Sequence, residues 1–176
     1  MANGTLKVSN IQTSSGSGTI TLGQSGETIT SSATMGNGMG KVLQVVSTNM
    51  DVDTTTTSSS YVAVTNFEVN ITPSSTSSKV FVLANWGAEQ DTSNGFGVFT
   101  LYRNDTTDLG NGSYGFGIQS ATGGVNRSLC NIMYLDSPST TSSTNYQVYF
   151  KVDNGGTVKV SPANARCTIT AMEIGA

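Results

Sequence analysis

The segment NYQVYFKVDNGGTVKV, residues 145–160, decides the fold class of this chain. Apolar and polar side chains alternate along residues 145–153, as they do in a strand that buries one face. The turn DNGG at 153–156 supplies residues that tolerate positive φ, and alternation resumes at 157–160. We therefore predict an antiparallel hairpin with one buried and one solvated face. The side chains expected in its core are Tyr146, Val148, Phe150 and Val152.

The same pattern recurs through residues 41–176 at spacings of about ten residues. No segment has a 3.6-residue apolar period with helix caps. The sequence therefore predicts an all-β protein: an antiparallel β-sandwich, jelly-roll-like because long loops separate many of the strands. The expected strands cover residues 42–50, 61–64, 67–71, 79–86, 96–103, 113–119, 127–135, 145–153, 157–160 and 166–174.

Residues 1–40 differ from the rest, since they are almost entirely Gly, Ser, Thr and Asn. Thr19-Ile20-Thr21 recurs as Thr28-Ile29-Thr30, and pieces this short bury little within one chain. We expect an ordered oligomeric stem or attachment arm at 1–40 and a sandwich head at 41–176. A flexible Gly/Ser linker is the alternative. The isolated aliphatic residues that favour a stem are Leu6, Val8, Ile11, Ile20, Leu22 and Ile29.

Charge is scarce in this sequence. Charged residues make up 11%, against about 25% in ordinary soluble domains, and the net charge is -3. The eight basic residues are scattered, whereas a nucleic-acid surface needs them clustered. No apolar run approaches the ~20 residues of a membrane helix, and no signal peptide is visible. We expect no nucleic acid, no membrane insertion, and assembly in a cytoplasm.

The sequence contains no histidine, which excludes Ser-His-Asp and Cys-His catalysis and most zinc or copper sites. Cys130 and Cys167 lack CxxC spacing, and we expect both as free thiols, with a disulfide as the alternative. No glycine-rich stretch has the context of a phosphate-binding loop. We therefore expect no metal and no cofactor.

Three pairs of carboxylates are close in sequence: Asp51 with Asp53, Glu89 with Asp91, and Asp105 with Asp108. We expect Asp51 and Asp53 on one strand face, the second pair in one loop and the third in one turn. A glycosidase needs two acids roughly 5–10 Å apart beside a sugar cleft. Acids this close in turns usually cap their own backbone. We therefore expect no enzyme activity.

Aromatic residues near loops rich in Asn, Ser and Gly are the candidates for partner contact. Rigid rings with adaptable polar neighbours suit both sugars and protein surfaces. For Trp86, packing in the core is the favoured interpretation, whereas Tyr114 is the most plausible exposed contact. The full candidate set is Trp86, Tyr102, Tyr114 and Phe116.

The strand expected at 127–135 is apolar on both faces. Leu129, Met133 and Leu135 share one face, and the alternate residues on the other are also apolar. A monomer would leave one of these faces in water. We therefore predict a homo-oligomer, with a homotrimer as the expected state.

Several stretches resemble the heads of tail-fibre-like structural proteins from environmental (marine or freshwater) bacteriophages. These are KVLQVV at 41–46, ITPSSTSSKVFV at 71–82, YLDSPSTTSSTNY at 134–146 and ITAMEI at 169–174. The likeness covers residues 41–176. It implies a trimeric β-sandwich located in a virion, without enzyme activity, and it marks strands and turns without identifying site residues.

Together these features suggest a tail fibre or receptor-binding head that contacts a host surface glycan or protein. Residues 1–40 would join it to other virion proteins of the tail or capsid. The alternative is a capsid decoration (cement) protein that stabilises the shell, because only about forty residues precede the head. A glycan-cleaving tailspike is less favoured.

Overall fold

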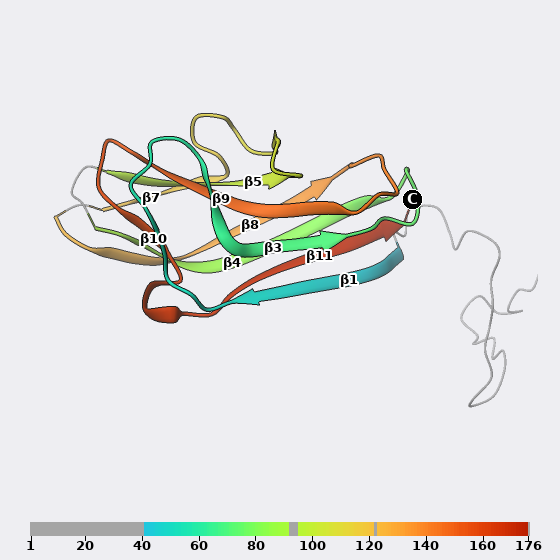
Figure 1. Ribbon diagram of the computed structural model, residues 1–176, viewed down its shortest axis with the longest axis horizontal. Coiled ribbons are helices and arrows are strands. Elements are labelled where there is room, and N and C mark those ends of the chain that lie inside the picture. Colours follow the sequence, from blue (N-terminus) through green and yellow to red (C-terminus); the bar gives the residue numbers. More distant parts are fainter. Residues whose placement is uncertain (1–40, 92–94, 122, 176) are drawn as a thin grey trace, which may run out of the picture. The chain divides into compact units, whose positions relative to one another are not determined.

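The computed structural model describes residues 41–91, 95–121 and 123–175, which form two facing β-sheets (Figure 1). The segment 1–40, expected to be a stem or arm, lies outside the described residues. In chain order the elements are β1 Lys41–Met50, β2 Thr54–Thr56, β3 Val62–Ile71, β4 Lys79–Gln90, β5 Phe96–Arg103, β6 Thr107–Asp108, β7 Gly117–Ser120, β8 Asn126–Asp136, β9 Thr144–Asp153, β10 Val158–Val160, the short 3-10 helix Pro162–Asn164 and β11 Cys167–Gly175.

The first sheet is built around β4. On one side, β4 pairs along its length with β8, from Val80–Asp136 to Gln90–Asn126. On its other side it pairs first with β11 and then with β10. β1 extends the sheet beyond β11, and β2 extends it beyond β10. Among the described residues, β1 and β8 are therefore the long edge strands of this sheet.

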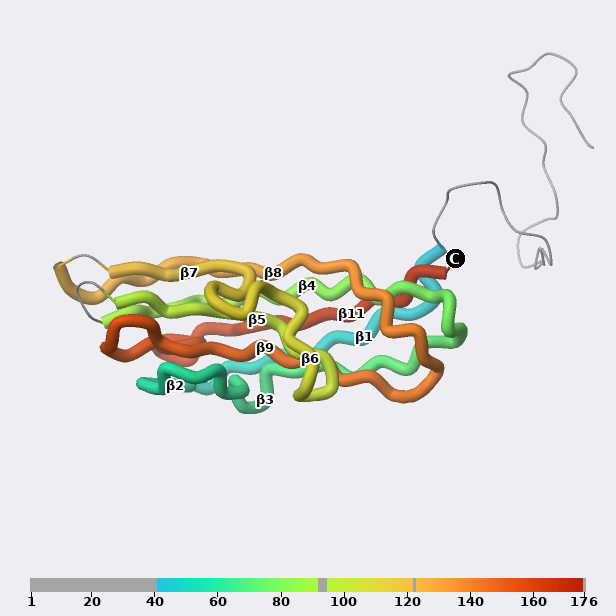
Figure 2. The backbone as a smooth tube through the Cα atoms, turned by 90° about the horizontal axis from the view of Figure 1, so that it is seen from above, coloured from blue at the N-terminus to red at the C-terminus, as the bar shows by residue number. Residues whose placement is uncertain are grey.

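The second sheet has the order β3-β9-β5, with β7 and β6 on the far side of β5. Every strand pair in both sheets is antiparallel, which confirms the predicted all-β antiparallel sandwich. Neighbouring strands come from distant parts of the chain, as with β1 and β11 or β3 and β9 (Figure 2). This connectivity is compatible with the expected jelly roll.

The prediction of a hairpin at 145–160 is wrong. The alternation is as expected, since Tyr146, Val148, Phe150 and Val152 are all buried. However, β9 belongs to the second sheet and β10 to the first, so the turn crosses from one layer to the other. Asn154, Gly155 and Gly156 adopt positive φ there. Apolar and polar side chains alternate in the same way whether two strands pair within one sheet or face each other across a core. The sequence pattern therefore did not distinguish the two arrangements.

Other boundaries also differ from the prediction. The loop expected at 51–60 contains β2, which pairs with β10, and the turn expected at 104–108 contains β6. The two strands expected at 61–64 and 67–71 form one irregular strand, β3, in which Asn66 has a φ of 63°. β7 is shorter than the strand expected at 113–119. Short polar strands carry too few apolar residues to show alternation.

Aromatic rings fill the space between the sheets. Trp86 of β4 is 1% exposed and makes tilted or edge contacts with Phe67 and Phe99 of the second sheet. The preferred interpretation of Trp86 as a core residue is therefore confirmed. Gly97 of β5 faces the first sheet so closely that an added Cβ would lie 2.4 Å from a methyl of Val158. Both sheets thus contribute side chains to one continuous core.

A buried polar group connects β5, β8 and β9. Asp136 is 5% exposed and receives hydrogen bonds from Arg103 at 2.8 and 2.9 Å and from the hydroxyl of Tyr146 at 2.7 Å. Burial and the bond to Asp136 raise the pKa of Tyr146. Asp136 and Tyr146 are buried and Arg103 is partly buried, so these hydrogen bonds help to fix how the ends of the two sheets meet.

Glu173 anchors the loop between β3 and β4 to the first sheet. Its carboxylate is buried and accepts hydrogen bonds from the backbone and hydroxyl of Ser74 and from the amide of Gln44. Burial alone would raise the pKa of Glu173, but the bonds from Ser74 and Gln44 outweigh burial and lower it to about 2.

We predict that Glu173 makes folding stability depend on acid. Its folded pKa of about 2 is below the ordinary value of 4.5. The stabilisation is therefore complete above pH 4.5 and is lost as pH falls from 4.5 towards 2. Glu173→Gln should reduce the free energy of unfolding at pH 7 by about 1–3 kcal/mol and flatten its dependence on pH in that window. Urea unfolding of both proteins between pH 2.5 and 7 measures this, and equal slopes would contradict it.

Candidate functional site

The outer face of the first sheet carries a row of apolar side chains across four strands. Cross-strand register places Val45 of β1 beside Met172 of β11, Met172 beside Phe81 of β4, and Phe81 beside Leu135 of β8. Paired residues of antiparallel strands point to the same side of a sheet. We call these four residues the apolar row. Val45 is 56% exposed and Leu135 is 48% exposed, so both ends of the row face water.

The face changes in character along the strands. Next to the apolar row toward the chain termini lie Val42 and Ile174, which pair with each other. On the other side of the row, Leu83 of β4 pairs with Met133, which is 62% exposed. In the row of Leu83 and Met133 the residues of β1 and β11 are polar, and in the next row all four strands carry polar, uncharged residues. That polar part consists of Ser47, Asn49, Asn85, Asn131, Thr168 and Thr170.

Charged side chains lie at the two ends of β4, with Lys79 at one end and Glu89 near the other. Glu89 is buried there between Arg127, at 2.5 Å, and Lys159, at 3.2 Å. Burial alone would raise the pKa of Glu89, but hydrogen bonds from Lys159 and Arg127 outweigh it and hold the pKa below its ordinary value. Glu89 lies within β4, so the expectation that it shares a loop with Asp91 is wrong.

Strand β8 has the two apolar faces that the sequence predicts. Ile132 is buried, and Cys130 and Tyr134 pack against the core. Leu129, Met133 and Leu135 point outward, and Leu129 is 77% exposed. The sequence pattern did not predict that Val45, Met172 and Phe81 lie on the same surface. Their alignment depends on the register between strands far apart in the chain, and the sequence pattern of one strand does not contain that register.

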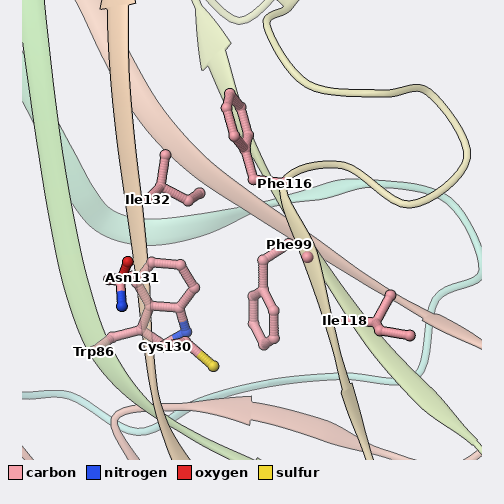
Figure 3. A pocket seen from close by; sticks show the side chains of 8 residues that line it. Trp86, Phe99, Phe116, Ile118, Cys130, Asn131 and Ile132 are labelled. Carbon is pink, nitrogen blue, oxygen red and sulfur yellow. The ribbon is translucent and has the colours of Figure 1, made fainter.

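Two of the four candidate contact residues line a small pocket between β7 and β8. Trp86 and Phe116 are both lining residues (Figure 3). Phe116 also packs edge-on against Tyr134, with ring centres 5.4 Å apart. The pocket has a volume of about 180 Å³. The Nε1 of Trp86 has no hydrogen-bond partner among the described residues and is itself buried. The other lining residues are Phe99, Gly117, Ile118, Cys130, Asn131 and Ile132.

The other two candidates occupy different places. Tyr102 lies on the outer face of the second sheet, stacked on Tyr149 with ring centres 4.2 Å apart and edge-on to Tyr61. Burial, followed by the nearby charge of Asp108, raises the pKa of Tyr102. Tyr114 is 54% exposed in the turn closed by the bridge between Asn111 and Gly115. The four candidates therefore do not form one site.

The carboxylate pairs mostly bind local backbone and hydroxyl groups. Asp108 accepts hydrogen bonds from the hydroxyl of Thr100 and the backbone N–H of Gly110. Asp105 accepts one from the hydroxyl of Tyr149. Asp51 and Asp53 follow the end of β1, so the prediction that they share a strand face is wrong. The bond from Gly110 to Asp108 is of the local kind that turn acids make, whereas the bond from Tyr149 to Asp105 joins residues far apart in the sequence.

Asp91 accepts a hydrogen bond from the backbone N–H of Thr157, beside the start of β10. Cys130 and Cys167 are both free thiols, and burial raises the pKa of each. Within the described ranges, no group of three His, Cys, Asp or Glu residues is arranged to hold a metal ion. The same part of the chain contains no helix long and apolar enough to span a bilayer.

Comparison with known proteins gives a distant structural likeness. No protein-family model matches the chain, and no curated protein sequence matches it. Chains in the structures of the Gt and Gx strains of infectious bursal disease virus overlay on it with TM-scores of 0.36 and 14% identity, covering 76% of this chain. A mutant VP2 protein of that virus, from derived T=1 particles, overlays with a TM-score of 0.35 and 13% identity over 74% of this chain.

The present chain spans between 36% and 38% of the length of those viral chains. An overlap of this extent assigns no function to this chain. The surface described above must therefore be interpreted from its own chemistry.

We predict that the two aromatic residues of the 104–117 segment differ in their effect on stability. Phe116→Ala removes a ring that packs against Tyr134 and the core, and should lower the free energy of unfolding by roughly 1–2 kcal/mol. Tyr114→Ala should change it by less than about 0.5 kcal/mol, because the ring is exposed. Urea unfolding followed by fluorescence of Trp86, the single tryptophan, measures both. Equal losses would contradict the assignment.

Proposed function

We propose that this chain is a structural protein of a virion, and that it acts as the trimeric head of a tail fibre that contacts a host surface. It works by binding and assembly, with no chemical step. Residues 1–40 join the head to other virion proteins, and the loops at the ends of the strands reach a host glycan or protein.

The observation that carries this proposal is the apolar outer face of the first sheet, where Val45, Met133 and Leu135 are exposed. Large apolar side chains exposed together mark surfaces that associate with other molecules, whereas scattered ones are ordinary. Here they are aligned across four paired strands, and the remaining outward residues between them are uncharged. A face of this kind favours a protein whose working state is an assembly.

The sequence resemblance to phage tail-fibre heads supports the same proposal from a separate source. The resembling stretches at 41–46, 71–82 and 169–174 all contribute to β1, β4 or β11, which are three of the four strands of the apolar row. The stretches of sequence that resemble the family therefore also contribute strands to the sheet that carries the apolar row.

We expect the protein to copurify with virus particles as a minor component. A tail fibre is present as a few trimers per particle, whereas a capsid decoration protein is present in many copies on the shell. Densitometry of purified particles, calibrated against the major capsid band, distinguishes the two. A copy number that approaches that of the shell protein would favour the decoration alternative, and absence from particles would contradict both.

We further predict that Tyr114 contributes to host attachment. Its ring is exposed on a turn closed by an Asn111–Gly115 bridge and flanked by small polar residues, which suits contact with a sugar or a protein surface. Particles that carry Tyr114→Ala should adsorb to host cells at least tenfold more slowly. Thr65→Ala, at an exposed position on the second sheet, is the control. Unchanged adsorption of the Tyr114 variant would exclude this contact.

A further inference from the structure

We infer that the apolar row is the surface through which copies of this chain associate with one another. This inference rests on the proposed function, because it names the partner of the face on which that function depends. The occupant is a second copy of the same chain, packed against Val45, Met172, Phe81 and Leu135.

The position of the row relative to the start of the sandwich supports this occupant. β1 begins at Lys41, which pairs with Gly175 at the end of β11, so both strand ends lie at one end of the sheet (Figure 2). The apolar residues concentrate at that same end, while Ser, Thr and Asn occupy the middle of the face. Forty residues of chain precede this point.

A tether at that end would favour contact between copies. If segments 1–40 of several chains associate, each head is held by the end where its face is most apolar. Joining sites through a short connection raises their effective concentration to the millimolar range. A face that associates only weakly with its copies then suffices for a stable assembly. A different protein that is not joined to the chain would not have this raised effective concentration.

Charge on the face also favours a copy as partner. Identical copies bring identical charges together, so a self-associating surface works best where charge is absent. The three complete rows that contain Val45, Ser47 and Asn49 include no ionisable side chain on any of the four strands. The nearest charges in the ladder are Lys79 at one end and the Glu89 group at the other.

The size of the face is adequate. Four strands about 4.8 Å apart and three rows about 6.7 Å apart have a flat footprint of roughly 400 Å². Side chains that stand on the sheet increase the accessible area, and Val42, Ile174 and Leu129 extend it. Two such faces therefore come close to the ~1,000 Å² total that a specific interface needs.

The test uses the full chain and three glutamate variants. Val45→Glu and Leu135→Glu place a carboxylate at the two ends of the apolar row. Val125→Glu is the matched control, because Val125 is 57% exposed and Val45 is 56% exposed. Val125 precedes β8 and is ten residues from Leu135, or about 33 Å along a strand. Sedimentation velocity at micromolar concentration measures the mass of each protein.

We expect the unchanged chain and Val125→Glu to sediment as the same oligomer, at three times the 18.2 kDa of one chain for a trimer. Val45→Glu and Leu135→Glu should weaken association at least tenfold and shift the population toward single chains, since each interface would bury unpaired carboxylates. Near-ultraviolet circular dichroism of the single tryptophan verifies folding. If a glutamate variant misfolds, Val45→Ser and Leu135→Ser replace it, and each should weaken association by a smaller factor.

Three results would overturn the inference. The unchanged chain sedimenting as a single subunit would mean that no second copy covers the row. If the folded Val45→Glu and Leu135→Glu proteins associate as strongly as Val125→Glu, the interface lies elsewhere. If all three glutamate variants associate equally weakly, the apolar row has no specific role in association. Copurification of the protein with particles is scored separately. If particles contain the protein but the folded row variants stay associated, the inferred interface is wrong and the proposed function is not. If the row variants dissociate but particles lack the protein, the proposed function is wrong and the interface is not.

Discussion

The structure depends on one constraint: the first sheet has apolar side chains on both of its faces. The inner face is satisfied by the second sheet, where Phe67 and Phe99 enclose Trp86. The outer face has no such cover among the described residues, and the apolar row crosses it from Val45 to Leu135. A sandwich offers only one interior, so a second apolar face is useful mainly to a protein that assembles.

Two buried carboxylates help to maintain the geometry of the sandwich. Glu173 holds the loop after β3, and Asp136 joins Arg103 to Tyr146 where the two sheets meet. Each carboxylate is buried and receives several hydrogen bonds, which makes it expensive to move. With charged residues at only 11% of the chain, these few buried acids fix the relative positions of the strands that they connect.

Alternation predicted the all-β class, the buried set in β9 and the two apolar faces of β8, because each of these is a property of a single strand. It did not predict which sheet β10 joins, since Val158 points into the same core from either sheet. Nor did it assemble the apolar row, whose members come from β1, β11, β4 and β8. Register between such distant strands arises from the packing of the whole domain. The sequence correctly favoured Trp86 as a core residue. That Tyr102, Tyr114 and Phe116 lie in separate places became visible only in the folded structure.

The pairing of the first long strand with the last has a consequence for biosynthesis. β1 forms its ladder with β11, and Gln44 and Glu173, which are 129 residues apart, are hydrogen-bonded. While a ribosome is still making the chain, β1 has emerged but its partner does not yet exist. The ladder between β1 and β11 forms only after β11 has also been synthesised, and such distant pairings form slowly. Newly synthesised chains therefore spend their first moments with β1 unpaired, and Lys41 is the one charged residue of that strand.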